Sequence, residues 1–94
     1  MSLVFADTFY FLGLLNRADE SHSRCAAFAR EYRGGVVTTA YVLVEVADGL
    51  AKPQHRVQTA KFIQMGRQRI QESGRQGAAL QPRQVGDRIL NISD

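Results

Sequence analysis

The sequence predicts an α/β fold with a parallel sheet, and two observations carry this prediction. Leu3 to Ala6 and Val36 to Thr38 are short apolar or β-branched runs, which is typical of buried strands. Segments with helical spacing follow each run, so the expected order of elements is β-α-α-β-α-α. Strands and helices that alternate in this way usually form a parallel sheet with helices packed against it.

The stretch from Leu3 to Leu15 holds one acid, Asp7, in an otherwise almost wholly apolar run. A strand over Leu3 to Ala6 and a buried helix over Phe9 to Leu15 place Asp7 between them. Ligands of open parallel sheets bind where a strand ends and a helix begins. Because burying an unpaired charge is expensive, Asp7 needs a backbone partner, a cation or a metal.

Three further helices are expected, and residues typical of helix ends mark their limits. Asp19 can cap the first of them, and either Thr38 or Thr39 can cap the second, in whose middle Glu45 lies. Pro53 follows the end of the second and precedes the third. The three helices are expected over about Asp19 to Tyr32, Ala40 to Ala51 and Gln54 to Gln71.

We expect one compact domain whose two parts differ in character. The 94 residues are 45% hydrophobic and 22% charged, which allows one core. Residues 1–65 carry the α/β pattern. Residues 66–94 are an atypical segment rich in Gly, Gln and Arg, without a core-forming period beyond the end of the fourth helix. A short strand over Arg88 to Ile92 is the one further element expected there.

The composition favours a cytoplasmic protein. The longest apolar run is too short to span a bilayer, and no basic leader precedes a signal-type core. Cys25 is the only cysteine, which excludes an internal disulfide and fits a reducing compartment. The net charge of +3 permits an anionic partner such as nucleic acid, although the basic excess lies mostly in the C-terminal segment.

Asp7 and Glu45 are the two acids set most deeply in apolar sequence. Both belong to elements expected at the same sheet edge, where two carboxylates would make an oxygen-lined site suited to Mg²⁺ or Mn²⁺. Asp7 could instead cap the first helix, and the two roles are compatible. Glu45 could instead be an edge-exposed glutamate whose carboxylate reaches solvent.

Other polar residues have structural explanations at least as good as catalytic ones. His22 lies one turn after Asp19, which allows a metal pair or a general base but favours a structural polar contact. Thr8 can cap a helix or hydrogen-bond a metal-bound water beside Asp7. Asp48 lies one turn beyond Glu45, either as a supporting acid or as an exposed helix residue.

The sequence resembles the PIN domain, the ribonuclease fold that includes the VapC-type toxins of bacterial toxin–antitoxin pairs. The resemblance runs from about Val4 to Leu50. It rests on the apolar strand that ends in Asp7-Thr8, the segment LLNRADESH with Asp19 and His22, and the segment VVTTAYVLVEVADGL around Glu45.

This resemblance implies a three-layer sandwich with a central parallel sheet, and a cluster of acids that binds Mg²⁺ or Mn²⁺ for RNA cleavage. Carried over, Asp7 is the first acid, Glu45 the second, and Thr8 the hydroxyl residue that often follows the first acid. The family's later acids have no counterpart in recognisable context, because only Glu72, Asp87 and Asp94 are acidic after residue 65. The C-terminal strands are therefore expected to be incomplete.

The sequence leads to two hypotheses of function. The first is a PIN-like, metal-dependent ribonuclease of toxin type that acts on RNA and is weak or inactive in this shortened form. The second is a non-catalytic PIN-like remnant that binds an antitoxin-like protein or a second copy of itself, as a homodimer, through exposed strand edges and apolar helix faces. A small basic RNA-binding protein is less favoured, because the aromatic residues do not interleave with the arginines.

Overall fold

The structure is a computed structural model, and it describes residues 3–85 and 89. The structure confirms that the chain combines helices with a β-sheet, as the sequence predicted. No described helix is both long enough and apolar enough to cross a bilayer. In chain order the elements are β1 (Leu3–Phe5), α1 (Thr8–Leu15), α2 (His22–Glu31), β2 (Gly35–Thr39), α3 (Ala40–Gly49), the 3₁₀ turn η1 (Pro53–His55), α4 (Arg56–Ser73), β3 (Gly77–Leu80) and α5 (Pro82–Val85).

The sheet has three strands in the order β1-β2-β3. β1 and β2 are parallel, as the sequence predicted. β3 runs antiparallel to β2, with Val36 opposite Leu80, so the sheet is mixed and not wholly parallel. The reason is that α3 and α4 carry the chain away from the end of β2 and back to it, where the Ala40 amide donates to the Gln76 carbonyl at 3.0 Å.

The strand β3 was not expected, because its sequence Gly-Ala-Ala-Leu has low β-propensity and no alternation. Gly74 ends α4 in the left-handed conformation, with φ of 69°, and turns the chain toward β3. The C-terminal segment also contributes to the core, since Leu80, Val85 and Ile89 are buried. The strand expected over Arg88 to Ile92 lies outside the described residues, apart from Ile89.

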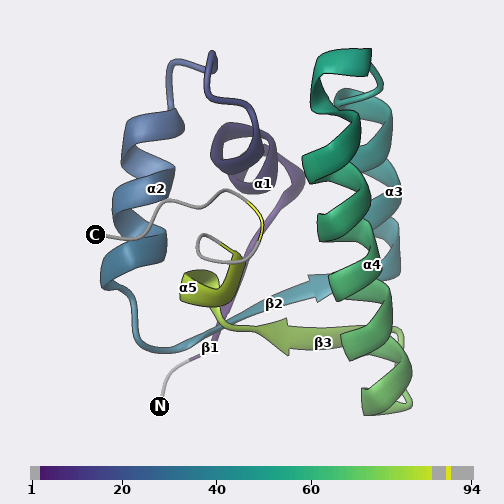
Figure 1. Cartoon of the computed structure of the whole chain (residues 1–94). Helices are drawn as coiled ribbons and strands as arrows, with labels where there is room; N and C mark the ends of the chain where they lie inside the picture. The colour runs from purple at the N-terminus through teal and green to yellow at the C-terminus, as the bar shows by residue number, and fades with distance from the viewer. Residues whose placement is uncertain (1–2, 86–88, 90–94) are drawn as a thin grey trace.

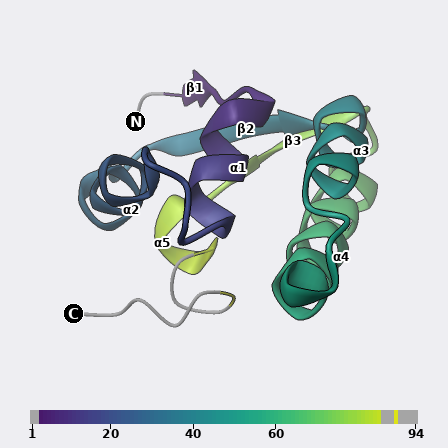
Figure 2. The same cartoon turned by 90° about the horizontal axis from the view of Figure 1, so that it is seen from above.

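The helices are unevenly distributed around the sheet (Figure 1). The strands lie at the foot of the molecule in this view, with α1 and α2 above them and the antiparallel pair α3 and α4 beyond the end of β2. Figure 2 shows the same arrangement from above, with α1 between α2 and the α3–α4 pair. In β1 the side chains of Leu3 and Phe5 are 65% and 59% exposed.

The core lies where α1 meets α3 and α4. The Phe11 ring of α1 and the Phe62 ring of α4 are both fully buried, with centroids 4.8 Å apart. Val42, Leu43 and Val46 supply the buried side of α3. This packing fixes the position of α3 relative to α1, and the candidate site lies between these two helices.

Candidate functional site

The two sequence-predicted acids belong to α1 and α3, and one short contact joins the two helices. The Thr8 hydroxyl donates a hydrogen bond to Glu45 Oε1 at 2.6 Å. Thr8 directly follows Asp7, so the Glu45 carboxylate lies beside the residue next to Asp7. The parallel pairing of β1 with β2 explains this, since the Ala6 amide still donates to the Val37 carbonyl and both strands end at the same edge.

Asp7 caps α1. Its side-chain Oδ1 accepts a hydrogen bond from the Tyr10 amide at 3.1 Å, and its backbone is extended. The carboxylate is exposed, so its charge is solvated and is not the buried charge that the apolar sequence suggested. A carboxylate has more acceptor sites than this one bond uses, which leaves capacity for a cation. Capping and metal binding therefore remain compatible for Asp7.

Glu45 lies on the half-buried side of α3. Val42 and Val46 flank it and are buried, whereas Val44 is exposed. Its carboxylate accepts the Thr8 hydroxyl, and this contact fixes the direction of the side chain toward α1. Thr8 was expected to cap a helix or bind a metal-bound water. Asp7 and not Thr8 caps α1, whereas the Thr8 hydroxyl orients Glu45, a role that the sequence did not indicate. Its bond to a metal-bound water stays a prediction.

The other predicted residues have structural roles. His22 Nδ1 lies 2.9 Å from the Gly13 carbonyl, which fits a ring N–H donor because a carbonyl only accepts. Asp19 was expected to cap a helix, but α2 begins at His22. Instead Asp19 accepts hydrogen bonds from the Ser21 amide and hydroxyl at 2.8 and 2.7 Å. These bonds lower the pKa of Asp19, and nearby His22 adds a smaller effect.

The remaining acids do not join Asp7 and Glu45 in the described part of the chain. No three His, Cys, Asp or Glu residues in residues 3–85 and 89 are grouped so that they could hold a metal. Asp48 is exposed and lines a groove between α3 and α4. Asp87 and Asp94 lie outside the described residues. Two carboxylates still fit Mg²⁺, which proteins often hold through one or two carboxylates with water or substrate phosphates in the other positions.

A hollow of about 390 Å³ adjoins Asp7, and sequence analysis gave no sign of it. Val4 and Val36 of the sheet form one side, and the rings of Tyr10 and Phe28 form another. The Tyr10 hydroxyl is buried without a hydrogen-bond partner among the described residues. Burial raises the pKa of Tyr10 far above its ordinary value, and Cys25 adds to the shift.

The chain matches no family model, no curated protein and no solved structure. The geometry of the site and the sequence are therefore the basis for the function proposed below.

Proposed function

We propose that this chain is a PIN-like ribonuclease domain that depends on Mg²⁺ or Mn²⁺ and has low activity. The observation that carries the proposal is the hydrogen bond from Thr8 to Glu45, the second acid. Thr8 directly follows Asp7, the first acid, so the bond holds Glu45 beside the neighbour of Asp7. The parallel pair β1 and β2, each leading into a helix, is compatible with a PIN-like sandwich. A third layer and further strands of such a sandwich are not among the described residues.

In this proposal Asp7 and Glu45 would hold the metal ion. The ion would lower the pKa of a bound water and offset charge on the phosphoryl oxygens of RNA. Asp7 keeps α1 capped through one bond to the Tyr10 amide, so its position depends little on the ion. Glu45 is held by Thr8 and need not be ordered by metal binding. With two protein carboxylates, we expect weak metal affinity and slow cleavage.

The experiment that tests this proposal has a binding arm and an activity arm. Mn²⁺ binding is followed by the loss of the free-ion electron paramagnetic resonance signal, and cleavage is followed on a labelled RNA of mixed sequence. The variants are Asp7→Asn and Glu45→Gln, which keep side-chain size and hydrogen-bonding capacity. Glu31→Gln, an exposed acid of α2, is the matched control.

The proposal predicts that Asp7→Asn and Glu45→Gln each weaken Mn²⁺ binding and slow cleavage by at least about tenfold, while Glu31→Gln changes neither. Equal Mn²⁺ affinity in all four proteins would contradict the proposal that Asp7 and Glu45 hold a metal ion. Metal binding without RNA cleavage would support the proposed metal site and contradict the proposed nuclease activity. The wider proposal of a cytoplasmic toxin with an antitoxin partner depends on cleavage being found.

A second candidate function is a non-catalytic interaction module, and the exposure of β1 favours it. All three residues of β1 are apolar, and Leu3, Val4 and Phe5 are 65%, 42% and 59% exposed. No described strand pairs with the outer edge of β1. Such an edge can accept an extended segment of another protein as an added strand. The hollow beside Val4 would receive side chains from that segment.

Amide hydrogen exchange tests this second candidate. The Ala6 amide bonds to β2, so the Phe5 amide points to the free edge, because N–H groups alternate along a strand. A synthetic extended peptide of alternating Val and Lys serves as the probe. Strand addition would be supported if the Phe5 amide exchanges its hydrogen more slowly when the peptide is present. The same slowing should be absent in Val4→Lys. Unchanged exchange at saturating peptide would count against it.

A further inference from the structure

The two outer edges of the sheet differ in what covers them. Neither the outer edge of β1 nor that of β3 pairs with another described strand, but side chains of α4 reach the β3 edge. We propose that Arg69 and Ser73 of α4 close the β3 edge to strand addition, so that an added strand can pair only with β1. The proposal goes beyond the two functions proposed above and depends on neither.

Gly77 and Ala79 carry the backbone groups of β3 that point away from β2. The Gln76 carbonyl accepts a hydrogen bond from the Ala40 amide at 3.0 Å, so Gln76 faces the β2 side. Residues that face the partner strand alternate along an antiparallel strand with residues that face away from it. The amides and carbonyls of Gly77 and Ala79 therefore point toward the place that a further strand would occupy.

Side chains of α4 already occupy both outward carbonyls. The Arg69 guanidinium donates to the Ala79 carbonyl at 3.1 Å. Ser73 Oγ lies 3.0 Å from the Gly77 carbonyl oxygen and 2.7 Å from that of Ile70, and its one hydrogen is available to either. A strand that paired with β3 would have to displace both side chains. The cationic guanidinium would also lie in its path, and charged side chains commonly protect edge strands.

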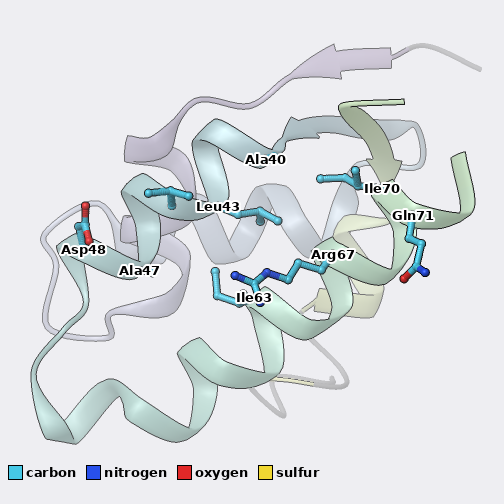
Figure 3. Close-up of a pocket in the computed structure, with 9 residues that line it drawn as sticks. Ala40, Leu43, Ala47, Asp48, Ile63, Arg67, Ile70 and Gln71 are labelled. Atoms are coloured by element: carbon cyan, nitrogen blue, oxygen red, sulfur yellow. The ribbon is translucent and has the colours of Figure 1, made fainter. Parts of the chain in front are cut away.

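The position of these two side chains follows from the helical repeat of α4. Arg69 and Ser73 lie at i+7 and i+11 from the buried Phe62, on the stripe of α4 that faces the core. Arg67 lies on another side of the helix and lines the groove between α3 and α4 (Figure 3). Gly74 then turns the chain, so that β3 runs back past the last turns of α4.

Closure of one edge limits how far copies of the chain can assemble through their sheets. With two open edges, β1 of one copy could pair with β3 of the next, and such a head-to-tail contact repeats without end. With the β3 edge closed, a strand that is added to β1 completes the pairing and no further copy can follow. The sheet is therefore open to one added strand and protected from growth into a fibre.

Sedimentation velocity from low micromolar to submillimolar concentration compares the wild type with the double variant Arg69→Met/Ser73→Ala. Methionine keeps much of the length of arginine without its donors. We expect nothing larger than a dimer in the wild type, whereas the mean mass of the double variant should rise with concentration to at least about threefold that of the wild type. Arg67→Met with Ser23→Ala makes the same changes of residue type away from the edge and should behave as the wild type.

Ala79→Pro should reverse the effect of the double variant. Proline lacks the amide hydrogen and is tolerated on edge strands where that hydrogen would face solvent. It therefore blocks an added strand without removing a bond to β2. Combined with Arg69→Met/Ser73→Ala, it should restore the wild-type mass. Assemblies that persist with Ala79→Pro would overturn the proposal, as would a double variant that stays as small as the wild type.

Amide hydrogen exchange tests the wild type itself, so this measurement does not depend on how the variants fold. In the wild type, a saturating concentration of the extended Val and Lys peptide should leave exchange of the Ala79 amide unchanged. In Arg69→Met/Ser73→Ala the peptide should slow it at least about tenfold. The Ala78 amide, which faces β2, shows whether β3 remains paired. Slower exchange of the Ala79 amide in the wild type with peptide would overturn the proposal, because the edge would then be open.

Discussion

The Thr8 hydroxyl donates to Glu45 Oε1 at 2.6 Å and thereby ties the first turn of α1 to the middle of α3. The contact spans 37 positions in the chain and is partly buried. A hydrogen bond to a charged acceptor is stronger than one between neutral groups. Thr8 therefore has two effects that can be measured separately, one on stability and one on the orientation of Glu45.

Replacing Thr8 by Val removes the donor and keeps the shape of the side chain. We expect the free energy of unfolding to fall by about 1–2 kcal/mol, because Glu45 loses a hydrogen bond in a partly buried place. If Glu45 binds metal, Mn²⁺ affinity should also fall about tenfold, as for other residues that orient a ligand. Urea unfolding and Mn²⁺ titration measure the two effects. Thr8→Ser keeps the hydroxyl and should retain most of the stability and most of the Mn²⁺ affinity. If the Val variant were as stable as the wild type, the hydrogen bond would contribute nothing to stability.

Asp7 can be substituted so that its capping and its charge are tested independently. Asp7→Asn keeps a side-chain oxygen for the Tyr10 amide, so we expect stability close to that of the wild type. Asp7→Ala removes the cap and should lower the free energy of unfolding by about 1 kcal/mol. Both variants remove the carboxylate and should weaken Mn²⁺ binding alike. Thermal or urea unfolding separates the variants, and equal stability of the Ala and Asn variants would contradict the capping role.

The parts of the fold that sequence predicted are those fixed by local chemistry. Asp7 and Thr39 cap α1 and α3 because each has an oxygen in position for a free amide, and such residues are recognisable in sequence. The position of α1 and α3 at one edge of the sheet followed from the parallel arrangement of two apolar strands, each of which leads into a helix. The contact between Thr8 and Glu45 depends on the rotation of α3, which the packing of Val42 and Val46 sets.

The parts that sequence missed depend on distant contacts. β3 has only small residues and Leu80, so its pairing with β2 comes from the return of the chain through α4 and not from its own pattern. Asp19 was expected to be a cap because its residue type favours caps, but Ser21 offers it both an amide and a hydroxyl. The contact of His22 with Gly13 requires two helices to approach closely, which no local spacing indicates.

Asp19 should give the protein a pH-dependent contribution to stability. Hydrogen bonds from Ser21 lower its pKa in the folded state below the ordinary value of 3.8. The folded state therefore binds this proton less readily than the unfolded state, and the stabilisation is present above about pH 4. It is lost as the pH falls through the folded-state pKa. In Asp19→Asn this acid-dependent loss should be absent.

Nuclear magnetic resonance titration of the Asp19 carboxyl measures this shift directly. Ser21→Ala removes the hydroxyl, the largest cause of the shift, and keeps the backbone amide bond. We expect the pKa of Asp19 to rise part of the way toward its ordinary value in this variant. Ser23→Ala, an exposed position of α2, should leave the pKa unchanged. An unshifted Asp19 pKa in the wild type would contradict the role assigned to Ser21.

Gly13 allows α1 and α2 to approach closely, and an alanine there should force them apart. A Cβ at this position would overlap Ser21 Oγ and lie 2.9 Å from Cys25 Sγ. Crowding of this kind destabilises by about 1–3 kcal/mol, which exceeds the gain of about 1 kcal/mol from replacing glycine within a helix. We therefore expect Gly13→Ala to lower the free energy of unfolding and to weaken the bond between His22 Nδ1 and the Gly13 carbonyl.

Two further variants show whether the close approach is the cause. For Gly49→Ala at the end of α3, the nearest atoms to the new Cβ are the two methyl carbons of Leu12, at 2.8 and 3.3 Å, which form the far end of a flexible side chain that can move. This substitution should be near neutral. Gly13→Ala combined with Ser21→Ala removes one of the two overlapping atoms and should be more stable than the sum of the single effects predicts. Urea unfolding measures the free energy of unfolding of each variant. If the effects of the two substitutions on it were strictly additive, Ser21 would not limit how closely α1 and α2 approach.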